Sequence, residues 1–217
     1  MKKAFIFDLD GTLANTLNSI AYFGNRALEA YGLPPVETAQ YRYMVGNGAV
    51  KLVHRMLAAS GNDTEVNFTK VFPLYNDSYD ADFMYLTEAY PGVPEALARL
   101  KEQGLTLAVL SNKPHPTTLK VVHNLYGEGL FDAVYGQREG IPLKPDPAAL
   151  CTVMAELGVT PEECVYVGDT ATDMQTGKGA GIFTIGVLWG FRDEEELREN
   201  HADVIIKEAD ELLNYTK

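Results

Sequence analysis

Ala4-Phe5-Ile6-Phe7, followed by Asp8-Leu9-Asp10-Gly11-Thr12, is the stretch of sequence that decides the fold. Four apolar residues without alternation are typical of a short strand buried on both faces, as in a parallel sheet. The two aspartates follow this strand at its carboxyl end, where open α/β sheets bind their ligands. Gly11 permits a tight turn that brings backbone N–H groups close to an anion. The stretch therefore predicts an α/β fold with a ligand site after its first strand.

Three further apolar runs repeat this arrangement, and a polar residue or glycine follows each of them. They are 105–110 before Ser111, 164–168 before Asp169, and 183–189 before Gly190, with a weaker candidate strand at 131–136. Between the runs lie segments with helical spacing, at 93–102, 147–157 and 171–177. Alternating strands and helices predict a doubly wound, Rossmann-like parallel sheet as the core of the protein.

Residues 15–86 break this alternation. They contain no convincing buried strand, but helical patterns occur at 17–31, 49–59 and 66–79. A crossover of this size exceeds one helix, so we expect an inserted α-helical domain at 15–86. Residues 1–14 and 87–217 then form the α/β core, and the turn at Tyr90-Pro91-Gly92 marks the return to it.

The charge of the chain limits its partners. It has 18 basic and 30 acidic residues, for a net charge of -12. This disfavours nucleic acid and anionic membranes, because both attract basic surfaces. An anionic substrate would need a local metal ion, placed lysines or a helix N-terminus. With no signal sequence or apolar span and only two cysteines, a cytoplasmic protein is expected.

Two pairs of aspartates are the candidate metal ligands. Asp8 and Asp10 lie two residues apart at a strand end, and their repulsion is costly unless a cation lies between them. Asp169 ends another strand, and Asp173 falls on the same face of a helix starting there. Oxygen ligands of this kind suit Mg²⁺. A calcium-binding EF-hand is excluded, since its sixth and twelfth positions would be Leu13 and Ser19. Helix capping is the competing structural explanation for both pairs.

Hydroxyl, amide and ammonium side chains are the candidate phosphate-binding groups. Ser111-Asn112-Lys113 follows a strand, where a hydroxyl and an adjacent cation can hold phosphate oxygens. Lys144 lies between Leu143 and Pro145 in a rigid loop, and it could serve as a point charge for a phosphate and a carboxylate. Taken alone, Ser111 could equally well be a helix cap, and an isolated lysine such as Lys144 is more often an ordinary exposed one.

Together, DLDGT at 8–12, Ser111, Lys144 and GDTATD at 168–173 resemble the four motifs of the haloacid dehalogenase superfamily, whose members are mostly phosphatases. The segments VLSNKP, GQREGIPLKPDP and GVLWGFRDEEEL are similar to its phosphoglycolate phosphatase branch. The resemblance implies that the helical insertion at 15–86 is a cap domain. One departure is Leu13-Ala14-Asn15-Thr16, where relatives often have an acidic residue followed by Ser.

The resemblance also implies roles for individual residues. Asp8 would attack phosphorus and form an aspartyl-phosphate, while Asp10 would protonate the leaving alcohol and then activate water. Contacts to the phosphoryl group would come from Thr12, Ser111 and Asn112, with Lys144 neutralising charge. Mg²⁺ would be bound by Asp8, the backbone carbonyl of Asp10 and Asp169. Asp173 would lie beside the metal or contact its ligands without binding it directly.

The substrate is expected to be a small phosphorylated metabolite. Plausible cap contacts to it are Arg42, Gly46, Asn47, Gly48 and Lys51. Phosphoglycolate, pyrophosphate, a nucleotide monophosphate and a sugar phosphate all remain open, and a sugar phosphomutase shares the same core. A dehalogenase or a non-catalytic phosphoacceptor module is disfavoured by Asp10, because neither needs an acid for a leaving group.

Overall fold

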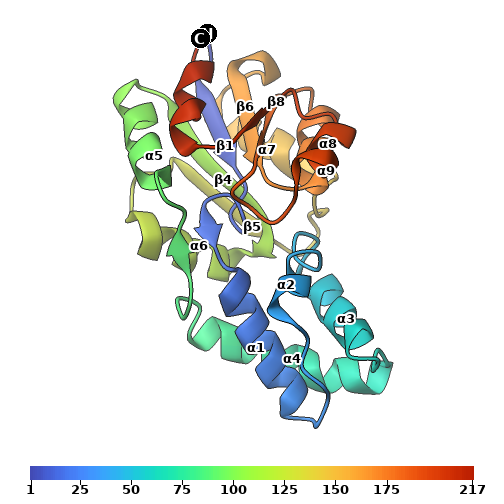
Figure 1. Cartoon of the computed structure of the whole chain (residues 1–217). Helices are drawn as coiled ribbons and strands as arrows, with labels where there is room; N and C mark the ends of the chain where they lie inside the picture. The colour runs from blue at the N-terminus through green and yellow to red at the C-terminus, as the bar shows by residue number, and fades with distance from the viewer.

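A six-stranded parallel sheet forms the core in the computed structural model, which describes residues 1–217 (Figure 1). The strand order is β5-β4-β1-β6-β7-β8. The strands are β1 (Ala4–Phe7), β4 (Thr106–Pro114), β5 (Ala133–Gln137), β6 (Cys164–Gly168), β7 (Phe183–Val187) and β8 (Val204–Ile206). Every neighbouring pair is parallel, which confirms the predicted fold class.

Helices cover both faces of this sheet, because successive side chains of a strand point to opposite faces. Phe5 and Phe7 of β1 pack on the side of α5 (Val93–Glu102), α6 (His115–Tyr126) and the 3-10 helix η2 (Ala209–Tyr215). Ala4 and Ile6 pack on the other side, in the cluster that includes α7 (Ala148–Leu157). The remaining core helices are η1 (Pro161–Glu163), α8 (Ala171–Gly179) and α9 (Glu194–Glu199).

The strand order brings the candidate residues together. The chain runs from β1 outward through β4 to β5, then returns to place β6 on the opposite side of β1. The carboxyl end of β1 is therefore a point where connections diverge, and ligands bind at such points in open α/β sheets. Asp8 follows β1, Ser111 lies near the end of β4 and Asp169 follows β6.

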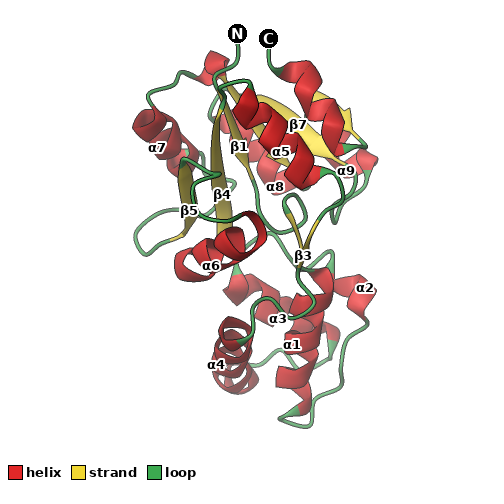
Figure 2. Cartoon of the chain, turned by 90° about the vertical axis from the view of Figure 1, so that its left-hand side faces the viewer, coloured by secondary structure: helices red, strands yellow, loops and turns green.

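Four helices form a separate group beside the core (Figure 2). They are α1 (Leu17–Glu29), α2 (Thr38–Tyr41), α3 (Ala49–Ala59) and α4 (Glu65–Ala81). They bury an apolar cluster distinct from the two that flank the sheet, with Leu28, Met56 and Leu57 fully enclosed. This group is the predicted helical insertion. No helix of the chain is both long and apolar enough to span a membrane.

Two short strands join the insertion to the core. Residues Ala14–Asn15 (β2) pair antiparallel with Glu88–Ala89 (β3). Two-residue strands carry no sequence pattern, so they were not predicted. Of the proposed cap boundaries, residue 15 lies within β2 and residue 86 lies two positions before β3. Strand β4 also continues past the predicted end at Leu110 to Pro114, so Ser111, Asn112 and Lys113 belong to the strand itself.

Candidate active site

Three carboxylates converge at the carboxyl ends of β1 and β6. Oxygens of Asp8, Asp169 and Asp173 lie within 4.8 Å of one another. Their exposed fractions are 6%, 0% and 0%, so all three are removed from water. Buried carboxylates this close repel each other strongly, which indicates a site built to hold positive charge.

The turn after β1 fixes Asp8 and leaves room for Asp169. The backbone N–H of Asp8 donates to the carbonyl of Val167 at 2.9 Å, which ties the turn to β6. Gly11 has a φ of +91°, and a side chain there would overlap the Asp169 carboxylate. Glycine is therefore required at position 11 both for its backbone conformation and for the close approach of the two segments.

Asp169 is held by two donors. One oxygen accepts from the backbone N–H of Phe191 at 2.8 Å, and the other from the hydroxyl of Thr12 at 3.2 Å. Burial raises the pKa of Asp169 well above its usual range, and the charges of Asp173 and Asp8 raise it further. The carboxylate is thus oriented by the fold, and the charge of Arg192 opposes the rise in pKa without forming an ion pair with Asp169.

Asp173 is both a helix cap and part of the acidic cluster, the two roles that the sequence left open. As the third residue of α8, its carboxylate accepts from the backbone N–H of Thr170 at 3.1 Å and from the Thr170 hydroxyl at 2.8 Å. This is a capping box at the start of α8. Its other oxygen accepts from the Lys144 ammonium at 2.8 Å. Asp173 therefore caps a helix and anchors Lys144.

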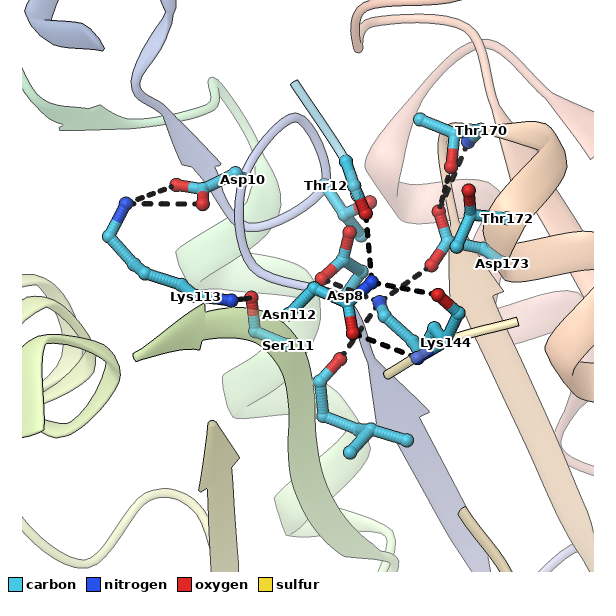
Figure 3. A network of polar contacts seen from close by, with 12 residues as sticks. Asp8, Asp10, Thr12, Ser111, Asn112, Lys113, Lys144, Thr170, Thr172 and Asp173 are labelled. Carbon is cyan, nitrogen blue, oxygen red and sulfur yellow. Dashed lines mark hydrogen bonds and ion pairs between the residues drawn. The ribbon is translucent and has the colours of Figure 1, made fainter. Parts of the chain in front are cut away.

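Lys144 is the cation at the centre of the site (Figure 3), and only 3% of it is exposed. Its Nζ lies 2.9 Å from Asp8 Oδ1 and also donates to the hydroxyl of Tyr166 at 3.1 Å. Burial lowers the pKa of Lys144, but the charges of Asp173 and Asp8 outweigh it and raise the pKa well above the ordinary value. Lys144 is therefore positively charged.

One buried lysine does not balance three buried carboxylates, so the site fits a metal ion. Burial raises the pKa of Asp8 to about 7, opposed by the charge of Lys144. Oδ1 of Asp8 is buried and lacks a hydrogen-bond donor, although the Lys144 ammonium lies 2.9 Å away, because that ammonium donates to Leu110, Tyr166 and Asp173. An all-oxygen donor set with excess negative charge suits a hard divalent cation.

Asp10 faces away from this cluster, toward Lys113 (Figure 3). The Lys113 ammonium lies 3.0 and 3.1 Å from the two Asp10 oxygens. The hydroxyl of Thr16 donates to Asp10 at 2.8 Å. Thr16 lies in the segment that departs from the pattern of relatives, and it takes a direct part in orienting Asp10. Sequence reasoning missed the Asp10–Lys113 pair because 103 residues separate its members.

Asn112 clamps three segments together. Its side-chain amide donates to the carbonyls of Gly46 and Lys144 at 2.9 and 3.0 Å, and its side-chain oxygen accepts from the Lys144 N–H at 2.9 Å. Asn112 thereby positions the Lys144 loop and a loop of the cap. The hydroxyl of Ser111 accepts from the backbone N–H of Lys113 at 3.2 Å, which leaves its proton available to a ligand.

A cavity of about 330 Å³ lies between core and cap, with Asp8, Asp10, Ser111 and Asn112 in its wall. Of the predicted cap contacts, Gly46 and Gly48 also line it.

The other three predicted cap contacts do not line the cavity. The guanidinium of Arg42 donates to the carbonyl of Phe191 at 2.7 Å, Asn47 donates to the Thr172 hydroxyl at 3.1 Å, and Lys51 is exposed. Helix α4 supplies Tyr75 and Tyr79 instead. Their helical spacing was indistinguishable from ordinary core residues in the sequence.

Comparisons with known proteins agree with this geometry. Residues 5–187 match the haloacid dehalogenase-like hydrolase family. The chain is 33% identical over 216 residues to a phosphoglycolate phosphatase of Pseudomonas putida, covering 98% of this chain and 79% of that one. It is 32% identical to a phosphoglycolate phosphatase of Haemophilus influenzae, covering 96% and 95%.

A crystal structure from Lactobacillus delbrueckii subsp. bulgaricus superposes with a TM-score of 0.94 at 30% identity, covering 100% of this chain and 99% of that one. The core, the inserted helices and their arrangement are thus shared over the full length. With the family match and the buried triad of aspartates, these findings confirm the resemblance seen in the motifs: the chain belongs to the haloacid dehalogenase-like hydrolase family and is a phosphatase of that family.

Proposed function

We propose that this phosphatase is Mg²⁺-dependent and hydrolyses a small phosphomonoester, with phosphoglycolate as the first substrate to test, through an aspartyl-phosphate on Asp8. The observation that carries the proposal is the buried triad of Asp8, Asp169 and Asp173 with Lys144 among them. The relatives named as phosphoglycolate phosphatases support the substrate.

Asp8 is the proposed nucleophile. A carboxylate oxygen of Asp8 attacks phosphorus, the bond to the leaving oxygen breaks, and the phosphoryl group is transferred to Asp8. Covalent catalysis of this kind splits one difficult displacement into two easier ones. Lys144, 2.9 Å from Asp8, supplies positive charge where the transferring oxygens gather. Ser111 is proposed to donate to the phosphoryl oxygens. Thr12 is proposed to do so by turning toward them the one hydroxyl proton that it gives to Asp169 here, and Asn112 holds the loop that carries Lys144.

Asp10 is the proposed general acid and base. It gives a proton to the leaving alcohol in the first step, then takes one from the water that attacks the phosphorylated Asp8. Asp10 is suited to this because it lines the cavity and is oriented by Thr16 at 2.8 Å. A group that transfers protons must lie within hydrogen-bond reach of the reacting atom.

Asp8, Asp169 and the backbone carbonyl of Asp10 are the proposed ligands of Mg²⁺, with Asp173 holding Lys144 beside them. When bound, Mg²⁺ neutralises charge on the phosphoryl oxygens so that a carboxylate can approach an anionic substrate. The cap, proposed as residues 15–86, closes over the cavity and excludes water during transfer. Of the predicted cap contacts to the substrate, Gly46 and Gly48 line the cavity, so we keep both as proposed contacts.

Phosphate release from a panel of esters, with and without Mg²⁺, tests the proposal. The panel comprises phosphoglycolate, p-nitrophenyl phosphate, pyrophosphate, a nucleotide monophosphate and a sugar phosphate. The proposal requires Mg²⁺-dependent release from at least one monoester. Interconversion of sugar phosphates without phosphate release would indicate a phosphomutase. Stable phosphorylation of Asp8 without turnover would indicate a phosphoacceptor module.

A further inference from the structure

We infer that Lys113 and Tyr79 form the subsite for the leaving group, and that this subsite favours phosphomonoesters whose leaving group carries a carboxylate. The inference rests on the proposed phosphatase function and adds the chemical feature of the substrate that the site recognises. It assigns a specificity-determining role to two residues from different parts of the fold, β4 of the core and α4 of the cap.

The position of Lys113 follows from its pairing with Asp10. Its Nζ lies 3.0 Å from Asp10 Oδ1, and both residues line the cavity. Because the group that protonates the leaving oxygen must lie within hydrogen-bond reach of it, a cation in contact with Asp10 is also close to the atoms beyond that oxygen. In phosphoglycolate those atoms are one methylene group and a carboxylate.

Lys113 is the single basic residue among those lining the cavity. Arg42 is engaged by the carbonyl of Phe191, and Lys51 lies outside. Lys144 is committed to the aspartates around the phosphoryl site. A carboxylate on the leaving group therefore has one cation available to it in this arrangement.

The ammonium of Lys113 keeps one donor free. It carries three N–H groups, and its only hydrogen-bond acceptors are the two oxygens of Asp10, at 3.0 and 3.1 Å. The Tyr79 ring lies on another side of it, with Nζ 4.5 Å from the ring centroid. Lys113 can therefore donate to a leaving-group oxygen while it stays paired with Asp10.

Tyr79 supplies the second donor. Its hydroxyl is buried and has no hydrogen-bond partner, although 5% exposure of the residue leaves its side chain in the cavity wall. Ser19 and Lys113 are its polar neighbours, and the hydroxyl of Ser19 likewise has no hydrogen-bond partner. Leaving a buried hydroxyl unpaired is costly, so a ligand oxygen at this place would relieve the cost.

The acidic residues of the cavity wall do not cancel this subsite. Asp80 is already paired with Lys120 at 2.7 Å and accepts from Thr117 at 2.9 Å. Asp77 is exposed, where water and ions screen its charge. Two donors beside Asp10, one of them cationic, are complementary to a carboxylate and offer nothing specific to an alkyl group.

The test compares phosphoglycolate with ethyl phosphate, which replaces the carboxylate by a methyl group. Non-reacting analogues, 3-phosphonopropionate and propylphosphonate, provide the same comparison in calorimetric binding to the Mg²⁺-loaded protein. The variants are Tyr79→Phe and Lys113→Met. Matched controls are Tyr43→Phe and Lys70→Met, which change exposed cap residues outside the cavity.

We expect the wild type to favour the carboxylate member of each pair by at least about tenfold, in keeping with a hydrogen bond to a charged group. Each cavity variant should lower that preference about tenfold, while the controls keep it. Lys113→Met also disturbs Asp10, so the ratio and the analogue binding are the readouts that matter, and Tyr79→Phe removes one unpaired hydroxyl without that complication.

An equal or reversed preference in the wild type, or an unchanged preference in both cavity variants, would overturn the inference. Failure of the phosphatase proposal looks different: no Mg²⁺-dependent phosphate release from either ester or from p-nitrophenyl phosphate. In that event the analogue binding still decides whether the subsite recognises a carboxylate.

Discussion

The ammonium of Lys144 lies 2.9 Å from Oδ1 of Asp8, with only 2% and 8% of the two side chains exposed. The pair joins a loop before α7 to the end of the central strand β1. Charges so far from water interact strongly, and removing one partner leaves the other uncompensated. The site and the stability of the chain therefore depend on the same contact.

Lys144→Met should destabilise the metal-free protein by about 3–5 kcal/mol, since it leaves three buried carboxylates without their cation. The free energy of unfolding in urea measures this. Lys101→Met is the control, because its partner Asp132 is 39% exposed and such pairs contribute under about 1 kcal/mol. Equal losses in the two variants would mean that burial does not strengthen the Lys144 contacts.

Asp169→Asn should have opposite effects with and without metal. Without Mg²⁺ the variant should be more stable than wild type, because one of three mutually repelling buried carboxylates is neutral. With Mg²⁺ at about 100 times its dissociation constant, wild type should gain about 2.7 kcal/mol and the variant little. Thermal unfolding with and without Mg²⁺ measures both, with the exposed Asp210→Asn as control. The same Mg²⁺ stabilisation in all three proteins would exclude Asp169 as a ligand.

Asp10→Asn should slow substrates according to their leaving groups. An alkyl phosphate needs a proton on its departing oxygen, so its rate of phosphoryl transfer should fall by about 10²–10⁴-fold. For p-nitrophenyl phosphate, whose leaving group is stable as an anion, the fall in that step should be smaller. Single-turnover kinetics separate the two cases, and an identical loss for both would argue against Asp10 as the acid.

Asp203 should govern part of the acid sensitivity. Its carboxylate accepts from the Thr184 backbone N–H at 2.8 Å and pairs with Lys178. Partial burial raises the pKa of Asp203, but the hydrogen bonds from Lys178 and Thr184 outweigh it and lower the pKa. The folded-state pKa is thus below the unfolded value of about 3.9.

The stabilisation from Asp203 is therefore present above about pH 4 and is lost as the pH falls through the folded-state pKa. Asp203→Asn should reduce stability at neutral pH and flatten its decline in acid. Unfolding free energies between pH 2 and 7 measure this. A variant as acid-sensitive as wild type would assign the decline to other carboxylates.

The sequence was sufficient for the parts of the site that follow from strand ends. Asp8, Ser111 and Asp169 each come at or after a strand of the same parallel sheet, so their convergence follows from topology. Runs of apolar residues without polar alternation likewise identified β1 and β6.

Other features depend on contacts between distant segments, which no local pattern encodes. Lys113 reaches Asp10 across 103 residues, and Tyr79 reaches the cavity through the packing of the cap. The β2–β3 pair is too short to leave a periodic signal. Arg42 and Lys51 were predicted as cap contacts, yet neither lies in the cavity wall: Arg42 donates to the carbonyl of Phe191 and Lys51 is exposed on α3.

The central claim is that Asp8 takes the phosphoryl group, and peptide mapping after acid quenching tests it most directly. Wild-type protein is mixed with p-nitrophenyl phosphate and Mg²⁺, quenched in acid within the first turnovers, and digested for mass spectrometry. We predict a phosphoryl group on the peptide containing Asp8, at the residue itself. A phosphoryl group on any other residue, or a burst of nitrophenol with no phosphorylated peptide, would contradict the mechanism.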